Sequence, residues 1–304
     1  MGIYGPVIDG VVIPAGVCAV LSLAGRYWPR RSARPLFAVA PAAGFVAGFL
    51  ALEGWPGFPP HDDWARILFV GVWCAVLAAV RASSGHLNRH DVWNAVWVAT
   101  SGAVAWLLTP AWVDDRAFQM AALGASASAV WLVLDGAMAR RSPVTGIAIG
   151  VLSASAVAAV LVLTGNAKLG LLAGSIAAVL FIQALIRLPA ARIGGVVAGE
   201  SAVTVQGIGS SGQHRGGGSG AGVATITGGL LPGLAYVGHF NNFSGVGWWV
   251  FALAAIAPAA AVVGDLPPFR TRGRPWSEVA VRLSAVVISC VVSVVGAARG
   301  YEPV

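Results

Sequence analysis

The stretch AGVATITGGLLPGLAYVG, residues 221–238, decides how often this chain crosses a membrane. It is apolar enough to cross once, and it follows GIGSSGQHRGGGSGAG at 207–222, in which half of the sixteen residues are glycine. Arg192 precedes both stretches, and HFNNFSG at 239–245 follows them. Residues 221–238 supply the one crossing that is required if Arg192 lies inside and 239–245 lies outside.

Lipid is the solvent that the composition of the whole chain requires. Of the 304 residues, 57% are hydrophobic and 10% are charged, whereas a soluble domain is about 45–50% apolar and about 25% charged. A soluble protein with so few charges could not cover its own surface. A chain of this length supplies about ten spans of ~20 residues with short loops, which leaves no room for a soluble catalytic domain of ordinary size.

The apolar runs predict an all-α, polytopic transmembrane helix bundle of about ten spans. It forms a single integral membrane domain over residues 1–304. The start, MGIYGPVIDG, has no basic segment before the first apolar run, so we expect the first span to be retained rather than cleaved as a signal peptide. The expected spans are 7–25, 36–52, 66–81, 92–110, 118–139, 144–164, 168–187, 221–238, 246–264 and 279–297.

The glycine-rich segment before the eighth span is expected to be a loop. Chains rich in Gly and Ser are flexible coils, so we interpret residues 193–220 as a flexible cytoplasmic loop. A phosphate-binding loop is not expected, because 207–222 contains no lysine and no flanking strand pattern. The remaining alternative is a local reading-frame error or a degenerated helix, since an out-of-frame stretch in a GC-rich gene reads as Gly, Arg, Ser and Ala.

The basic residues indicate the orientation of the chain. Cytoplasmic loops carry an excess of Lys and Arg. If ten spans alternate, fourteen arginines fall on one side, whereas Arg66, Arg116, Lys168 and Arg299 fall on the other. We therefore expect the N-terminus out and the C-terminus out, in a multi-pass protein of a bacterial-type inner membrane. A missing span would scramble this alternation, so the pattern also supports the count.

Neither the net charge nor the cysteines indicate a further partner. The net charge is +7, but it is spread over loops rather than gathered on one face, so no nucleic-acid partner is expected. Cys18, Cys74 and Cys290 each lie within an apolar run. We interpret them as small core residues rather than as a disulfide or metal-binding set.

Two short motifs match known enzyme families in part. DGAMAR at 135–140 resembles the opening of the CDP-alcohol phosphotransferase signature, which implies metal-dependent headgroup transfer; the residues that follow carry none of the further carboxylates that the signature needs. SSGH at 83–86 resembles an element of the lipid-phosphate phosphatases, but the upstream basic position is Tyr27 and no downstream His-Asp set follows. We expect Asp135 to pair locally with Arg140 or with a neighbouring loop.

Two polar stretches in loops contain the residue types that bind metals. HLNRHD at 86–91 places two histidines four apart, as helical metal ligands are. HDDW at 61–64, with Glu53, Asp114 and Asp115, forms an acidic external rim of a kind that hard cations prefer. We interpret both stretches as solvated loops and predict no catalytic, cofactor-binding or metal-binding residues.

The predicted membrane interior is poor in ionisable groups, which proton-relay machines need at depth. The small residues of GASASA (124–129) and GVLSASAVA (150–158) favour close helix packing, so we expect a dry, close-packed interior. Helix breaks at Pro41, Pro232 and Pro258 are of the kind that transporter binding sites use. The polar residues expected near the midplane are Thr100, Ser101, Ser126, Ser128, Ser153, Ser155 and Ser175, with Gln183 nearer an end.

These features favour a permease for a small neutral or lipid-like solute, with the lipid bilayer and that solute as the expected partners and no cofactor. A non-catalytic membrane subunit or scaffold of a larger complex is the first alternative. A membrane enzyme acting on a lipid-linked substrate is the second, and catalysis is the less favoured reading. Ten helices in about 300 residues resemble the drug/metabolite transporter superfamily in size alone, because those proteins are expected to keep both termini inside.

Overall fold

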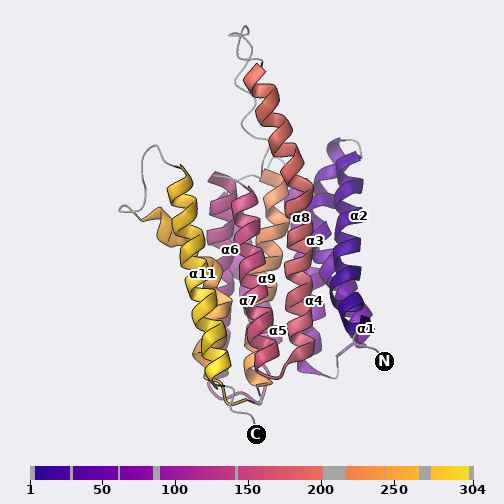
Figure 1. Cartoon of the computed structure of the whole chain (residues 1–304). Helices are drawn as coiled ribbons and strands as arrows, with labels where there is room; N and C mark the ends of the chain where they lie inside the picture. Colours follow the sequence, from indigo (N-terminus) through magenta and orange to yellow (C-terminus); the bar gives the residue numbers. More distant parts are fainter. Residues whose placement is uncertain are drawn as a thin grey trace.

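The computed structural model describes residues 4–27, 30–60, 62–84, 90–140, 143–200, 217–242, 244–266 and 275–300. All regular structure in these ranges is helical, and the helices lie side by side in one bundle (Figure 1). The first half contains α1 (Tyr4–Val7), the π-helical η1 (Ile8–Val12), α2 (Ile13–Tyr27), α3 (Arg30–Glu53), the 3₁₀-helical η2 (Asp63–Arg66), α4 (Ile67–Ser83), α5 (His90–Leu108) and α6 (Arg116–Arg140). The second half contains α7 (Pro143–Leu163), α8 (Ala167–Glu200), α9 (Gly217–Phe240), α10 (Trp248–Ile256), the 3₁₀-helical η3 (Ala257–Asp265) and α11 (Pro275–Gly300).

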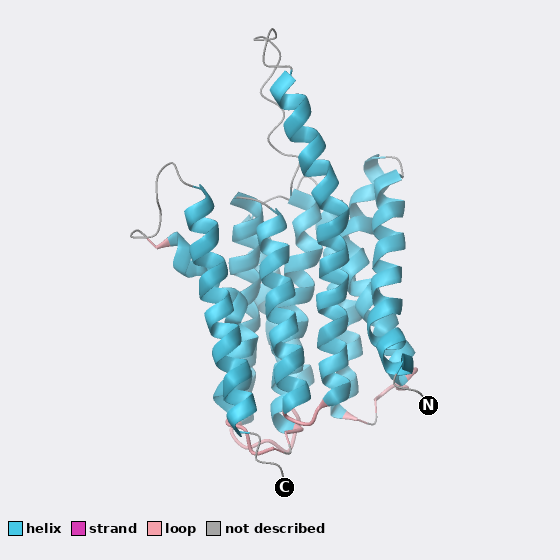
Figure 2. Cartoon of the chain, in the orientation of Figure 1, coloured by secondary structure: helices cyan, strands magenta, loops and turns pink. Residues whose placement is uncertain are grey.

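Nine helical segments within the described residues are long and apolar enough to cross a membrane. The predicted all-α transmembrane bundle is thus confirmed in its class (Figure 2). The predicted span at 92–110 corresponds to α5, whose apolar part Val92–Leu108 is shorter than the other nine. Those nine are Gly5–Gly25, Pro35–Glu53, Asp63–Ser83, Arg116–Gly136, Val144–Leu163, Ala167–Arg187, Gly222–Phe240, Trp248–Asp265 and Ser277–Gly300.

The glycine-rich connection is shorter than the sequence predicts. Helix α8 continues to Glu200, and α9 begins at Gly217, so both ends of the expected loop 193–220 are helical. Residues 201–216 lie outside the described ranges. A helix start within GGGSGAG contradicts the flexibility that its composition indicates, and the packing of α9 gives the reason.

Helix α9 forms the centre of the bundle (Figure 1). It contacts α3, α4, α5, α6, α7, α8 and α10. Its span Gly222–Phe240 is 83% buried inside the protein, the largest share among the spans that the structure describes, and its mean hydropathy of 1.2 is the lowest of them. A helix surrounded by other helices presents little surface to lipid, so its residues need to pack closely rather than to be strongly apolar.

Glycines allow neighbouring helices to approach the backbone of α9 closely. A Cβ at Gly222 would collide with the backbone of Ala38 in α3. A Cβ at Gly228 would lie 2.9–3.2 Å from the backbone and Cβ of Trp131 in α6. Small residues at interfaces are the usual means by which helices associate in lipid, where no hydrophobic force drives them together. The glycines that suggest a loop in the sequence therefore allow α9 to pack closely against α3 and α6.

The three expected proline breaks have different outcomes. Helices α3 and α9 continue through Pro41 and Pro232, so no break occurs there. Neighbouring helices and local adjustments satisfy the freed backbone groups in such cases. Pro258, in contrast, lies where α10 ends at Ile256 and the chain continues as the narrower 3₁₀ helix η3. The third break is therefore confirmed.

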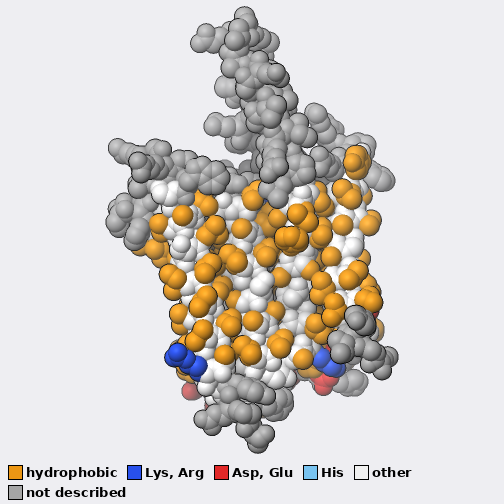
Figure 3. Space-filling model, viewed as in Figure 1, with side chains coloured by type: hydrophobic (Ala, Val, Ile, Leu, Met, Phe, Trp, Pro, Cys, Tyr) orange, Lys and Arg blue, Asp and Glu red, His pale blue; other side chains and the backbone are white. Residues whose placement is uncertain are grey.

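Hydrophobic side chains cover the visible face of the bundle, and the charged side chains that can be seen there lie at its lower end (Figure 3). Lys168 at the start of α8 pairs with Glu53 at the end of α3, with 3.1 Å between Nζ and Oε2. Arg282 in α11 pairs with Asp265 at the end of η3 and is only 2% exposed. These pairs tie helix ends together where ions are least costly.

Candidate functional site

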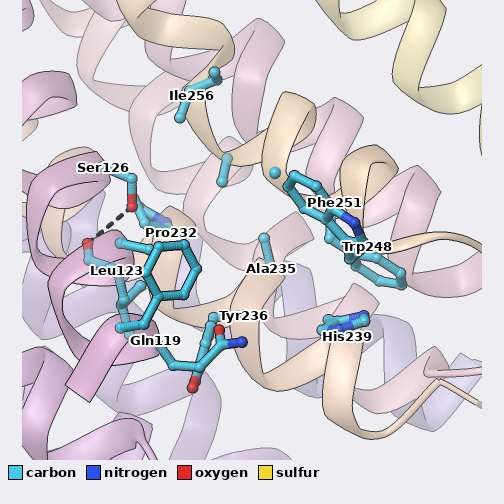
Figure 4. Close-up of a pocket in the computed structure, with 14 residues that line it drawn as sticks. Gln119, Leu123, Ser126, Pro232, Ala235, Tyr236, His239, Trp248, Phe251 and Ile256 are labelled. Carbon is cyan, nitrogen blue, oxygen red and sulfur yellow. Dashed lines mark hydrogen bonds between the residues drawn. The ribbon is translucent and has the colours of Figure 1, made fainter. Parts of the chain in front are cut away.

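An apolar pocket of about 500 Å³ lies between α6, α9 and α10. The first turns of α6, the last turns of α9 from Pro232 onward, and α10 with its end at Ile256 supply the lining (Figure 4). Ligand sites typically have volumes of about 300–1,000 Å³ and mostly apolar walls with a few polar groups. The pocket is therefore of the size and character of a small-molecule site.

The pocket lies in the half of the bundle that contains the chain ends. Gly300, the last residue of α11, lies against Val246 just before α10. At this end the pocket reaches the protein surface beside Phe118 and Trp248, which are 70% and 67% exposed. Ile256, at the opposite end of the lining, is also 41% exposed, whereas Leu123 is buried. The pocket is thus exposed along one flank and backed by buried residues on the other.

Polar groups are concentrated near the open end of the pocket. The lining includes Gln119, Tyr236 and His239 (Figure 4). His239 Nδ1 is buried and has no hydrogen-bond partner in the part of the chain that the structure describes. Its ring lies between Phe240 and Phe251, with centroid distances of 5.2 and 5.6 Å.

The hydroxyls of Ser126 and Tyr236, both in the pocket lining, differ in their hydrogen bonds. Ser126, deeper in α6, donates its hydroxyl to the Leu123 carbonyl at 2.8 Å and so has no proton left for a ligand. The Tyr236 hydroxyl makes no hydrogen bond of normal geometry within the described residues. It faces Thr109, which already donates to the Ala105 carbonyl at 2.7 Å. The unused hydrogen-bonding capacity therefore lies toward the open end.

The pocket is closed toward the opposite end of the bundle by tight packing. Gly228 of α9 lies against Trp131 of α6, about one turn beyond the pocket residue Pro232. The Trp131 ring is buried and stacks on Trp97 of α5, with 5.3 Å between centroids and 18° between planes. These two rings fill the space between α5, α6 and α9, toward the end of the bundle away from the chain ends, and neither lines the pocket.

A buried ion pair lies beside the Trp131 ring. Arg81 Nη2 at the end of α4 lies 2.6 Å from Asp135 Oδ1 in α6, and both side chains are nearly buried. The Arg81 guanidinium also lies 4.9 Å from the Trp131 ring centroid, within cation–π range. Asp135 therefore pairs with a helix end across the bundle, whereas the side chain of Arg140, its expected partner, lies outside the described set. Asp135, the residue of the DGAMAR motif, has a structural role here.

A second buried polar cluster links α2, α3 and α8. Gln183 Nε2 donates to Ser22 Oγ at 2.7 Å and to the Phe37 carbonyl at 3.5 Å. Gln183 Oε1 accepts from Arg187 Nη2 at 3.3 Å. Gln183 and Ser22 have no exposed surface. The cluster joins helices, and it lines no pocket that the structure describes.

The remaining motif residues are dispersed or lie outside the described side chains. The side chains of His86, His90 and Asp91 lie outside the described set. In the acidic rim, Asp63 pairs with Arg66 at 2.6 Å, as Glu53 does with Lys168. No group of three or more His, Cys, Asp or Glu side chains comes together in the described residues. The cysteines are free and buried, which confirms their interpretation as core residues.

The pocket is the feature that the sequence does not reveal. The expected close-packed interior holds where Gly222 and Gly228 of α9 meet α3 and α6, but it is wrong where α6, α9 and α10 surround the pocket. Pro232 and Pro258 are the available signal, because one lines the pocket and the other follows its end at Ile256. The polar lining residues belong to helices far apart in the chain, so no local spacing brings them together.

Comparisons of the chain with protein-family models, curated proteins and solved structures gave no match. Function is therefore inferred from the structure, above all from the pocket and its surroundings.

Proposed function

We propose that the protein is a ten-span permease of a bacterial inner membrane and carries a small neutral or lipid-like solute. The observation that carries this proposal is the one-sided pocket between α6, α9 and α10. A carrier needs a site that is open to one side of the membrane and closed to the other. Here the pocket is exposed beside Phe118 and Trp248, and the close approach of Gly228 in α9 to Trp131 in α6 ends it toward the other side of the membrane.

The proposed topology counts α5 as the tenth span and places both termini outside. Two observations support it. The first helix begins and the last helix ends at the same end of the bundle, which requires an even number of crossings (Figure 1). The positive-inside pattern assigns that end to the outside. A reporter enzyme that is active only outside the cell, fused to the C-terminus, is expected to be active. A reporter that is active only inside would overturn the topology.

Transport is tested with purified protein in vesicles. Three single-chain amphiphiles share one fluorescent chain and differ in carrying a sugar, a carboxylate or a quaternary ammonium head. Albumin added outside extracts the probe from the outer leaflet and so reports its movement between leaflets. We expect vesicles that contain the protein to move at least one probe faster than protein-free vesicles. If none of the three probes moves faster in vesicles with the protein than in protein-free vesicles, the proposal is overturned.

Neighbouring alanines on α6 provide a matched pair of variants. Ala122 lines the pocket, whereas Ala121 faces away toward α5, and both are exposed. Ala122→Trp fills part of the pocket and is expected to slow transport at least about fivefold. Ala121→Trp adds the same side chain to the same turn and is expected to leave the rate within about twofold. If both variants slow transport equally, the pocket is not the site through which the solute is transported.

A second candidate, a membrane subunit of a larger complex, is supported by one observation. The apolar span of α8 ends at Arg187, yet the helix continues to Glu200 and projects beyond the other helices (Figure 1). A projecting helix is available to a protein partner. A stoichiometric partner that co-purifies with the full chain, and is lost when the segment 188–200 is removed, would favour this function.

A further inference from the structure

We infer that the solute is a single-chain amphiphile with an uncharged polyhydroxyl head, such as a glycerol or a sugar, held by Gln119, Tyr236 and His239. This inference rests on the proposed function, because it takes the pocket to be the solute site. It adds the orientation of the solute in the pocket and the chemistry of the head group that the pocket binds.

The charge of the lining selects an uncharged head. No Arg, Lys, Asp or Glu lines the pocket among the described residues. An ion moved from water into such surroundings loses its hydration and gains no partner, which costs several kcal/mol. Arg116 lies close enough to Tyr236 to act on its hydroxyl, but it is not among the lining residues. A carboxylate, phosphate or ammonium head therefore finds no ion-pair partner in the lining itself, and the fatty-acid probe tests whether Arg116 supplies one.

The polar side chains select a head with several hydrogen-bonding groups. Gln119 carries an amide that both donates and accepts, Tyr236 carries a hydroxyl, and His239 Nδ1 is a buried atom without a partner in the described chain. A buried polar atom without a partner costs about 1–3 kcal/mol, which a ligand removes when it supplies the bond. These three groups surround the same end of the pocket (Figure 4). A ligand with one hydroxyl can bond with only some of these three side chains, whereas a polyol can bond with all of them.

The rest of the pocket fits a hydrocarbon chain. Beyond the polar end, Pro232, Ala235, Phe251 and Ile256 present apolar walls, and the Ser126 hydroxyl is already occupied by Leu123. A volume of about 500 Å³ is within the range of sites for one small ligand, so a single chain is expected rather than a two-chain lipid.

The direction of the solute follows from the helix ends. His239 lies in the last turn of α9, and Trp248 begins α10. Tryptophan belongs to the interfacial region of a membrane, where its ring has an apolar and a polar edge. The head therefore lies at the outer interface and the chain points toward the bilayer centre, which is the orientation of an amphiphile in the outer leaflet.

The test is photo-crosslinking of the full-length protein in phosphatidylcholine vesicles. Three probes carry the same diazirine-labelled chain: a monoacylglycerol, the corresponding fatty acid and the corresponding alkane without a head. We expect the monoacylglycerol to label peptides from 118–126, 232–239 and 248–256 at least about fivefold more than the fatty acid at equal concentration. Excess unlabelled monoacylglycerol is expected to abolish that labelling.

The head-group residues are tested with substitutions that remove single polar groups. Tyr236→Phe and His239→Phe are each expected to reduce monoacylglycerol labelling about three- to tenfold and to leave alkane labelling unchanged, as the loss of one neutral hydrogen bond predicts. Tyr27→Phe removes the same hydroxyl at an exposed position on α2 and is the matched control. Thermal unfolding of each purified variant confirms that it folds.

The outcomes distinguish the inference from the proposed function. If the alkane and the monoacylglycerol label the pocket equally, or the fatty acid labels it best, the head-group assignment is wrong although the pocket binds lipid-like molecules. If no probe labels these peptides, or Ala122→Trp leaves every probe unaffected, the pocket is not the solute site and the proposed function fails with it.

Discussion

Helices α9 and α11 are opposite in composition and in position. The span of α9 has a mean hydropathy of 1.2 and is 83% buried, whereas the span Ser277–Gly300 in α11 has a mean hydropathy of 2.3 and is 17% buried. In a water-soluble protein the most apolar helix is the most buried one. In this pair the order is reversed, which places the more apolar helix toward lipid. The reversal does not extend to α7, whose span Val144–Leu163 has the highest mean hydropathy, 2.4, and is 56% buried.

The largest effect is expected when a side chain is added at one of the closely packed glycines of α9. Gly222→Val places a branched side chain against the backbone of Ala38, which cannot rotate away. We expect a loss of more than about 3 kcal/mol in the free energy of unfolding, or failure to accumulate folded protein. Denaturation in mixed micelles measures this loss.

Gly16 on α2 provides the control for that experiment. A Cβ at Gly16 meets no atom within 4 Å, and the residue is exposed. Gly16→Val is therefore expected to leave stability within about 0.5 kcal/mol, since a lipid-facing position has nothing to displace. If both valines cost the same, close approach to α9 does not explain the position of its glycines.

A pair of isoleucines sharpens the comparison at smaller cost. Ile226 in α9 is fully buried, and Ile288 in α11 is 62% exposed. Ile226→Ala leaves a cavity and is expected to cost about 3 kcal/mol, whereas Ile288→Ala exchanges one lipid contact for another and is expected to cost less than about 0.5 kcal/mol. The same unfolding assay compares them, and equal losses would mean that α11 is packed in a larger assembly.

The smallest expected effect concerns polar contacts between helices. Gln183→Leu removes the hydrogen bond to Ser22, and such bonds in membrane proteins average about 0.6 kcal/mol. A double-mutant cycle with Ser22→Ala isolates that term. A coupling energy above about 2 kcal/mol would show that this cluster, and not the small residues around α9, holds the bundle together.

The positions of the spans were predictable because composition alone determines them. The predicted span 144–164, for example, corresponds to α7 at Pro143–Leu163. The start of α9 was not predictable, because glycine favours coil in water and is tolerated in a helix that other helices surround. The start of α9 is therefore explained by the helices packed against it and not by its local sequence.

The candidate site could be predicted from the sequence only in part. Pro232 and Pro258 indicate irregular helices, and His239 is recognisable as a polar residue near a helix end. That His239, Tyr236 and Gln119 face one pocket depends on the packing of α6 beside α9, which no local pattern records. The pairing of Asp135 with Arg81 is of the same kind, because it joins helices 54 positions apart in the chain.

The central place of α9 has a consequence for biosynthesis. Proteins are made from the N-terminus, so α2 to α8 leave the ribosome before the helix that fills the space among them. The low hydropathy of α9 makes its own partition into lipid weak. We therefore expect its insertion to depend on the earlier helices already being assembled around a space of the right shape.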